Sequence, residues 1–553
     1  MKPRILRIGI WLSSLSILMT NCSYYLPHLP QESSPAFSVV NEKTADSLMT
    51  DSGVALAYSL QIHDPIPTGL ATKIQQALES QIVQLNADTQ IQYTSDSRQV
   101  LGEWIYVAAT AFSSLEDEIS AVQIQRLWQG SPMDDTWTNL YVLKEDIEIL
   151  SLLFGEASST YVIPIKPEDA LQTAWREPSA LFILPFEEIS PRWKILQFDG
   201  VSIFSRPFDS QSYPLSIYYI YSSSTPISLN KATELPLTNF DPQKMTTVLM
   251  TGVTALTRAT GAKMESEGMT YPASSIREVL LDADITHISN EVSFAEDCPP
   301  ADPHQVSVMF CSRPEYFDLL TSIEVDVVEL SGNHLMDWSV KAFSDSLTLY
   351  ENAGMGIYAG GINQTAARQP YKISLNGNHL AFLGCNPAGP PNVWATEDNP
   401  GVANCDGEWM LSAVEQLVRE GYLPIVTMQH FETYAMQPNP AQKADFLKLS
   451  AHGAVIVSGS QAHLPQGMTF VGNHFVHYGL GNLFFDQMDI PVVGTRREFL
   501  DRHIFYEGNY IQTELFTTLL EDYARPRLMT DEERDLFLTD IFTASGWYDR
   551  RIE

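Results

Sequence analysis

The sequence predicts an α/β protein with two folded domains. At 553 residues the chain is too long for one ordinary hydrophobic core. Its composition, 44% hydrophobic and 10% aromatic, is sufficient to fill large cores. After about residue 246, short β-rich runs alternate with amphipathic helical segments. Such alternation is typical of layered α/β domains in which at least part of the sheet is parallel.

The first 22 residues have the pattern of an export signal. Three cations precede an apolar stretch of about a dozen residues, which is short for a membrane span. Cys22 follows directly, and the segment resembles a bacterial lipoprotein signal, whose cysteine becomes lipidated; Asn21 departs from the small residue usual before it. The resemblance implies an extracytoplasmic protein, anchored to the bacterial cell membrane through Cys22. An uncleaved signal anchor and simple secretion are the alternatives.

Residues 23–50, rich in Pro and Ser, are expected to form a tether, and residues 51–228 a mixed α/β domain. Residues 71–85 are amphipathic and predict a helix, whereas 104–112 and 179–186 have the composition of buried strands. Residues 229–245 are polar and contain prolines, which predicts a linker.

The second domain is predicted over residues 246–500, with 501–553 as a C-terminal extension packing on it. Helices are expected over 338–354 and 406–422. The expected strands are 246–250, 283–289, 325–330, 423–428, 453–458 and 474–480.

Charge and cysteine content narrow the function. A net charge of −34 argues against nucleic acid as a partner, because no general basic surface neutralises phosphates. It also disfavours binding of an anionic polymer unless a cation or a local basic patch intervenes.

Four cysteines form an even set that predicts disulfides in an oxidising compartment, with three connectivities open: Cys298, Cys311, Cys385 and Cys405. Local pairing would staple two loops, at 298–311 and 385–405.

Polar side chains follow the strands of the second domain. Parallel strands collect such residues in the crevice outside their carboxyl ends, so we expect them to converge. A mixed set of carboxylate, amide and imidazole groups suits Mn, Zn or Fe, which would polarise an oxygen and activate a water. The residues are Asn290, Glu291, Asn333, His334, Gln429, His430, Gln461, His463, Asn482 and Asp486.

Each of these residues has a simpler interpretation. An Asn-His pair after a strand is commonly a turn or a helix N-cap. Glu291 alone could be solvated, and Gln429 and His430 could make polar loop contacts. His474 and His477 flank apolar residues and are expected to be strand positions.

An ordered set of motifs over about residues 246–487 resembles the CapA family of capsule-synthesis proteins, associated with poly-γ-glutamate. SGNHLMDW resembles the family's Asn-Asn-His segment, SNE its Asn-Leu-Glu motif, and YAGGINQTAARQP its Ala-Arg-x-Pro loop. VSGSQAHLPQ and HYGLGNLFFDQ resemble its closing motifs. The family belongs with the calcineurin-like metallophosphatases, so the resemblance implies a four-layer α/β/β/α sandwich.

Departures from the family pattern put the chemistry in doubt. The aspartate expected to bind the first metal is Val253, and the first histidine of the closing pair is Gln461. Where the family has His-Trp-Gly, the chain has Gln-His-Phe at 429–431. The set left to hold a divalent metal (Mn, Zn or Fe), Glu291, Asn333, His430, Gln461 and His463, supports one ion at best. Asn333 and His334 would be catalytic, His334 as proton donor to a leaving group.

The first domain resembles the type-2 periplasmic solute-binding fold through LWQG at 127–130 and YPL at 213–215. A cleft for a sugar or an anion is the functional interpretation, although Trp128 and Tyr213 could be ordinary core or loop aromatics.

Two functions follow for the whole chain. The first is a CapA-like, lipid-anchored protein of capsule or exopolymer biosynthesis, with a metal-dependent hydrolase site that has lost ligands and an anionic exopolymer or its precursors as substrate. The second is a non-catalytic surface protein that binds such a polymer or a small ligand. Val253 and Gln461 favour the second, and the retained Glu291, Asn333, His334 and His463 favour the first.

Overall fold

The computed structural model describes residues 61–62, 64–80, 83–84, 89–95, 100–222, 228–229 and 235–548. The expected signal, the tether and Cys22 lie outside these residues. Among the residues described, no helix combines the length and apolar character needed to cross a membrane. Residues from Tyr58 onward form one compact unit.

The N-terminal domain is built on a mixed sheet in which β4 (Val100–Ala111) is central. Strand β4 is antiparallel to its neighbours β11 and β8, whereas β6 runs parallel to both β8 and β7. Residues 237–238 of the expected linker form β13, which adds to β4. The other elements include β1 (Gln61–Ile62), α1 (Thr68–Glu79), β3 (Gln90–Thr94), α2 (Ala121–Trp128), β6 (Asn139–Leu143), α3 (Ile147–Phe154), β7 (Val162–Ile165), α4 (Pro167–Arg176), β8 (Ala180–Pro185), β9 (Trp193–Ile195) and β11 (Ser216–Ser222).

Trp128 and Tyr213 belong to the core of this domain. Trp128 is fully buried, and its indole N–H donates to the Gly155 carbonyl at 2.9 Å. Tyr213 is 2% exposed and packs against Phe198 and Phe208. Both residues are therefore buried core aromatics, which was the simpler of their two interpretations.

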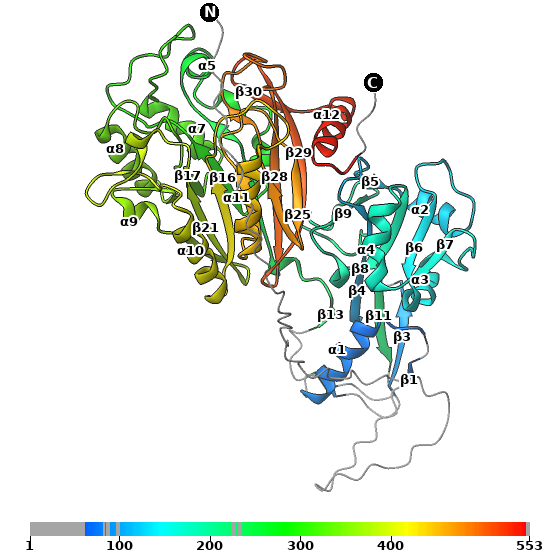
Figure 1. Ribbon diagram of the computed structural model, residues 1–553. Helices are drawn as coiled ribbons and strands as arrows, with labels where there is room; N and C mark the ends of the chain where they lie inside the picture. The colour runs from blue at the N-terminus through cyan, green and yellow to red at the C-terminus, as the bar shows by residue number, and fades with distance from the viewer. Residues whose placement is uncertain are drawn as a thin grey trace, which may run out of the picture. The chain divides into compact units, whose positions relative to one another are not determined.

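The second domain contains two packed sheets (Figure 1). The first has the order β18-β17-β16-β14-β28-β29-β30; its β14, β16, β17 and β18 are parallel, and β28 to β30 are antiparallel. Its strands are β14 (Met245–Met250), β15 (Val253–Thr254), β16 (Ile285–Asn290), β17 (Val327–Glu329), β18 (Gly356–Tyr358), β27 (Asn482–Phe484), β28 (Arg497–Tyr506), β29 (Asn509–Glu521) and β30 (Arg525–Leu528).

The second sheet has the order β20-β21-β23-β24-β26-β25, with four parallel strands between two antiparallel edges. His474 and His477 lie on β26, as expected. The strands are β20 (Tyr371–Leu375), β21 (Asn378–Cys385), β23 (Leu423–Met428), β24 (Ile456–Gly459), β25 (Met468–Val471) and β26 (His474–His477).

Three hydrophobic clusters separate four layers. One packs α5 (Arg258–Glu267), α7 (Phe317–Ser322) and α8 (Val340–Asn352) on the first sheet. A second fills the space between the sheets, and a third packs α10 (Gly407–Arg419) and α11 (Pro440–Ala451) on the second sheet. The helices thus cover the outer face of each sheet, which confirms the predicted α/β/β/α sandwich preceded by a smaller α/β domain.

Residues after 500 contribute more than a surface extension. Strand β28 pairs with β14 from Met245 to Met250, so it lies inside the first sheet, and the expected boundary at residue 500 falls within it. Helix α12 (Asp531–Ala544) then contacts the N-terminal domain, where Arg534 pairs with Asp117. Residues after 500 therefore complete the first sheet of the second domain and also contact the N-terminal domain.

Both disulfides are local. Cys298 bonds to Cys311, and Cys385 bonds to Cys405. Of the three connectivities open from the sequence, the structure has the one that staples two separate loops, one in each half of the sandwich.

Candidate functional site

The loops that follow β16 and β17 approach each other closely enough to bring Glu291 beside Asn333. Gly332 makes this approach possible, because a Cβ atom on it would lie 2.6 Å from the Glu291 Cα. Val292 and His334 form an isolated parallel bridge next to this point. Glu291 is 2% exposed, so its carboxylate is buried at the sheet edge as the strand-end rule predicted.

Gln429, the first residue after β23, links these two loops to each other. Its Nε2 donates to the Glu291 Oε1 at 3.1 Å and to the Asn333 Oδ1 at 3.1 Å. The hydroxyl oxygen of Ser460 lies 3.2 Å from its Oε1. Three strand ends are therefore cross-linked by one side chain that is itself 1% exposed.

Beneath this amide lies a buried carboxylate, Glu329. The hydroxyls of Ser331 and Ser460 both donate to its Oε1, the latter at 2.9 Å. Burial raises the pKa of Glu329, and the hydroxyl donors offset part of that effect. Ser460 thus connects Glu329 to Gln429 in one continuous hydrogen-bonded network.

The position of the family's first aspartate is apolar. Val253 is 1% exposed and belongs to a cluster with Ala255, Val292, Phe310 and Phe485. Nearby, the guanidinium of Arg258 lies over the Phe310 and Phe485 rings and pairs with Asp486. A cation at this position would face methyl and phenyl groups instead of a ligand oxygen.

His334 is held by Asp337. Its Nδ1 lies 2.7 Å from the Asp337 Oδ2, and its ring packs edge-on against Phe310. Burial opposes protonation, but the hydrogen bond to Asp337 and the charge of Glu291 outweigh it, so the pKa of His334 is raised. The raised pKa favours the protonated imidazolium relative to a free histidine, which is the direction that a proton donor or an anion partner requires.

The two remaining predicted histidines have other partners. The His430 Nε2 lies 3.2 Å from the Asp445 Oδ2 of α11, and none of its contacts is with Glu291, Asn333 or His463. The His463 Nδ1 lies 2.7 Å from the Asn482 Oδ1, and its ring stacks on Phe485.

The residues present do not fit a resident transition metal. Among the residues that the structure describes, no three His, Cys, Asp or Glu side chains are grouped closely enough to hold one. The place between Glu291 and Asn333 is taken by an amide nitrogen, and several buried oxygens are left without a partner, among them Glu291 Oε2, Gln461 Oε1 and Asn290 Oδ1. Gln461 Oε1 and one carboxylate oxygen are a poor set for Mn, Zn or Fe, which favour imidazole, thiolate or several carboxylates.

The strand-end pattern pointed to Glu291, Asn333, His334 and Gln429, but the predicted metal and catalytic residues did not include Gln429, which the structure places at the centre of the site. Asp337 is the trailing aspartate of the quoted motif. Asp445 was missed, and nothing in the strand-end pattern points to it, because it lies on a helix that follows a loop.

Fold and site together define a layered α/β domain with a buried, amide-bridged polar site at the carboxyl ends of its strands. Residues 247–487 match the family described as the bacterial capsule synthesis protein PGA_cap. Over this domain the chain is similar to the CapA family of capsule-synthesis proteins.

Curated relatives agree with this family. The PGA biosynthesis protein CapA of Bacillus subtilis (strain 168) is 24% identical over 204 residues, covering 36% of this chain and 52% of that protein. The capsule biosynthesis protein CapA of Bacillus anthracis is 26% identical over 165 residues, covering 29% and 40%. A probable polyglutamine synthesis accessory protein of Mycobacterium tuberculosis is 23% identical over 220 residues, covering 37% and 56%. The chain thus spans about half the length of the relatives it matches.

Two solved structures were also compared. The 5'-nucleotidase precursor of Thermus thermophilus aligns with 55% of this chain and 58% of its own at 13% identity, with a TM-score of 0.29. An ABC-type phosphate transport receptor of Vibrio cholerae aligns with 32% of this chain and 88% of its own at 11% identity, with a TM-score of 0.23.

Proposed function

We propose that the chain is a membrane-anchored, extracytoplasmic accessory protein of capsule or poly-glutamate-type polymer synthesis, and that its strand-end site binds or scaffolds without hydrolysing. The observation that carries this proposal is the Gln429 amide nitrogen, 3.1 Å from both Glu291 Oε1 and Asn333 Oδ1.

The amide does for the two loops what a cation does in a metal centre. It presents two hydrogens to two oxygens that would otherwise be buried without partners, so the loops stay cross-linked without a metal. A cation that bridged the same oxygens would first have to displace Nε2, which costs about 1.5–3 kcal/mol for the hydrogen bond to the carboxylate alone. Because Val253 supplies no ligand in return, the displacement has little to offset it.

A metal-dependent hydrolase with a single ion is the second candidate. It is favoured by two unpartnered oxygens, Glu291 Oε2 and Gln461 Oε1, and by the His334–Asp337 pair. In that case Glu291, Asn333, Gln461 and His463 would supply the ligands, and His334 would hold the proton for a leaving group.

Metal content and activity decide between the two. The full-length chain, purified from membranes, is incubated with Mn, Zn or Fe, freed of excess ion and measured by mass spectrometry. Phosphodiesterase and γ-glutamyl hydrolase activities are followed in parallel. We expect no stoichiometric binding of metal and no activity above that of a His334→Ala and a Glu291→Ala variant. One equivalent of metal that is lost in Glu291→Ala, together with activity lost in both variants, would establish the hydrolase instead.

The anchor has its own test. If Cys22 carries the lipid, Cys22→Ser moves the protein from the membrane fraction to the supernatant without changing its folded stability. Retention of the variant on the membrane would point to an uncleaved signal anchor.

A further inference from the structure

A cavity of about 310 Å³ lies where the N-terminal domain meets the residues that follow helix α12. Four segments line it: the loop after β4, the residues just before β6, the end of α4 with the residues after it, and residues 547–548. Its volume is near the lower end of those that hold small ligands. We call this space the tryptophan cavity, because three tryptophans line it.

The walls of the tryptophan cavity are aromatic. Trp137, Trp175, Trp547 and Tyr548 all belong to its lining. The rings of Trp175 and Trp547 lie 5.4 Å apart at an angle of 82°, so they present two perpendicular surfaces. Trp137 is 5% exposed, and no other aromatic ring of the described chain packs against it. Such rings offer broad apolar faces of fixed shape to a ligand.

Two of the tryptophans have a free hydrogen-bond donor. The Trp175 indole N–H donates to the Arg192 carbonyl at 3.2 Å, but those of Trp137 and Trp547 find no acceptor among the described residues. Three hydroxyl groups of the lining are likewise unused within the described chain, and each can donate or accept. They belong to Ser113, Thr136 and Ser179. A ligand that carries several hydroxyl groups would satisfy these positions.

The charge of the lining selects against an anion. Among the described residues that line the tryptophan cavity, Glu116 alone is charged, and its carboxylate forms no ion pair with them. The charge of Glu116 does reach Lys194, but this cation is already paired with Asp117 at 2.6 Å. An anionic ligand would therefore meet a carboxylate without a free cation, whereas the hydroxyls of a neutral ligand can donate to it.

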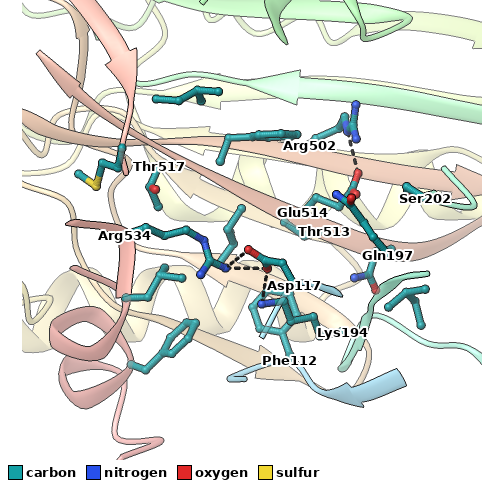
Figure 2. A pocket seen from close by; sticks show the side chains of 18 of the residues that line it. Phe112, Asp117, Lys194, Gln197, Ser202, Arg502, Thr513, Glu514, Thr517 and Arg534 are labelled. Atoms are coloured by element: carbon teal, nitrogen blue, oxygen red, sulfur yellow. Dashed lines mark hydrogen bonds and ion pairs between the residues drawn. The ribbon is translucent and has the colours of Figure 1, made fainter. Parts of the chain in front are cut away.

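The loop that carries Glu116 is held from behind. The carbonyls of residues 113–115 each accept a hydrogen bond, in order from the Tyr548 hydroxyl, from Lys194 at 2.9 Å and from Arg534 at 2.9 Å. Figure 2 shows that Lys194 and Arg534 also meet at Asp117, each at 2.6 Å. The backbone of this loop is thus fixed before a ligand arrives, which lowers the ordering cost of binding.

We propose that the tryptophan cavity binds one neutral pyranose ring. An apolar face of the sugar packs on a tryptophan ring, and its hydroxyls bond to the free indole N–H groups, to the lining hydroxyls and to Glu116. A sugar ring combines C–H faces with a rim of hydroxyls, so it matches both the aromatic walls and the free polar groups.

Other ligands match fewer of these features. A quaternary ammonium ion suits aromatic walls beside a carboxylate, but it would leave both indole N–H groups unused. An apolar ring would leave every polar group of the lining unused. The tryptophan cavity is separate from the strand-end site, so the assignment does not depend on the proposed function.

Calorimetry and tryptophan fluorescence test the assignment with the full-length chain, kept in a detergent without a sugar headgroup. The probes are methyl β-glucoside and methyl β-galactoside. Their matched ligands are the corresponding uronides, which carry a carboxylate in place of the hydroxymethyl group, and choline is the cationic alternative. We expect at least one neutral glycoside to bind at millimolar concentration and to change the fluorescence, and its uronide and choline to bind about tenfold more weakly.

Three variants locate the binding. Trp137→Phe, Trp547→Phe and Glu116→Gln should each weaken binding of the neutral glycoside about tenfold, because each removes one hydrogen-bonding group and keeps the shape of the wall. Glu118→Gln is the matched control, since Glu118 is an exposed carboxylate two residues from Glu116 that does not line the cavity, and it should leave binding unchanged. Glu116→Gln should also narrow the difference between glycoside and uronide. Glu116 is exposed, so this variant remains informative if a tryptophan variant unfolds.

Three results would overturn the assignment. The first is that neither glycoside binds at millimolar concentration. The second is that the three variants bind the glycoside as tightly as the Glu118→Gln control. The third is that choline binds at least tenfold more tightly than both glycosides, which would make the cavity a cage for a cation. Because sugar binding is measured, and not hydrolysis or metal content, each result stands apart from the test of the proposed function.

Discussion

Replacing Gln429 by glutamate should turn the central cross-link of the strand-end site into a repulsion. The substitution preserves shape, but it places a carboxylate oxygen where the amide nitrogen now lies 3.1 Å from the Glu291 Oε1. The donors to Glu291 and Asn333 are lost in the same step. The variant therefore probes the one contact on which the proposed function depends.

The magnitude follows from the geometry. Two carboxylates about 4 Å apart repel by roughly 4 kcal/mol at an effective dielectric constant near 20. Uptake of one proton by the pair relieves the repulsion, and this costs little near pH 5 but roughly 4 kcal/mol near pH 8. The folded variant thus binds more protons than the unfolded chain, so its stability falls as pH rises. Relative to Gln429→Leu, which loses the same donors, we expect the repulsion to cost about 4 kcal/mol at pH 8 and about 1 kcal/mol at pH 5.

Thermal unfolding followed by tryptophan fluorescence measures this loss. At about 2 °C per kcal/mol, the Tm of Gln429→Glu at pH 8 should lie about 8 °C below that of Gln429→Leu. Gln429→Leu is the matched control, since it loses the same donors without adding charge, and its deficit should not change between pH 5 and pH 8. Mn or Zn should raise the Tm of Gln429→Glu, because the new carboxylate pair can bind a cation, and should leave the wild type unchanged.

Two results would refute this reasoning. If Gln429→Glu is as stable as the wild type at both pH values, the amide does not hold Glu291 in solution. If Mn or Zn stabilises the wild type as strongly as the variant, a metal already competes for the place that we assign to the amide.

Three further predictions concern other parts of the chain. Burial raises the pKa of Asp146 to about 7, despite the hydrogen bond from a tyrosine, so this group makes the stability of the protein fall as pH rises through about 7. Asp146→Asn should remove this pH dependence and gain up to about 4 kcal/mol at pH 8, measured by urea unfolding. The Cys385–Cys405 bond closes a loop with a sequence separation of 20, so replacing both cysteines by serine should cost about 3 kcal/mol of stability. The urea midpoint of the double variant should be lower than that of the wild type, and this difference should vanish when both proteins are reduced. Gly332→Ala should cost about 1–3 kcal/mol, because its Cβ would lie 2.6 Å from the Glu291 Cα; an unchanged Tm would mean that the two loops are not packed as described.

The layered fold was largely predictable. The runs at 246–250, 423–428 and 453–458 are short, β-branched and bounded by turn residues, and they form β14, β23 and β24. The role of residues after 500 was not predictable in the same way. β28 pairs with β14, and antiparallel pairing between strands so far apart in sequence leaves no local pattern.

At the site, position was predictable but side-chain direction was not. The end of β23 places Gln429 and His430 at the edge of the sheet, yet successive side chains of an extended chain point to opposite sides. Gln429 consequently meets Glu291, and His430 meets Asp445. The resemblance to a metal-binding family identified which ligands were missing. The structure shows that the Gln429 amide hydrogen-bonds to Glu291 and Asn333 and so connects the two loops.

The β14–β28 pairing also bears on how the protein is made. Met245 is translated long before its partner Tyr506, so during synthesis β14 has one neighbour, β16, and an unpaired backbone edge. Contacts between segments this distant in sequence form slowly, because the intervening chain must first be brought into register. The first sheet of the second domain therefore cannot be completed until the residues of β28 have been translated.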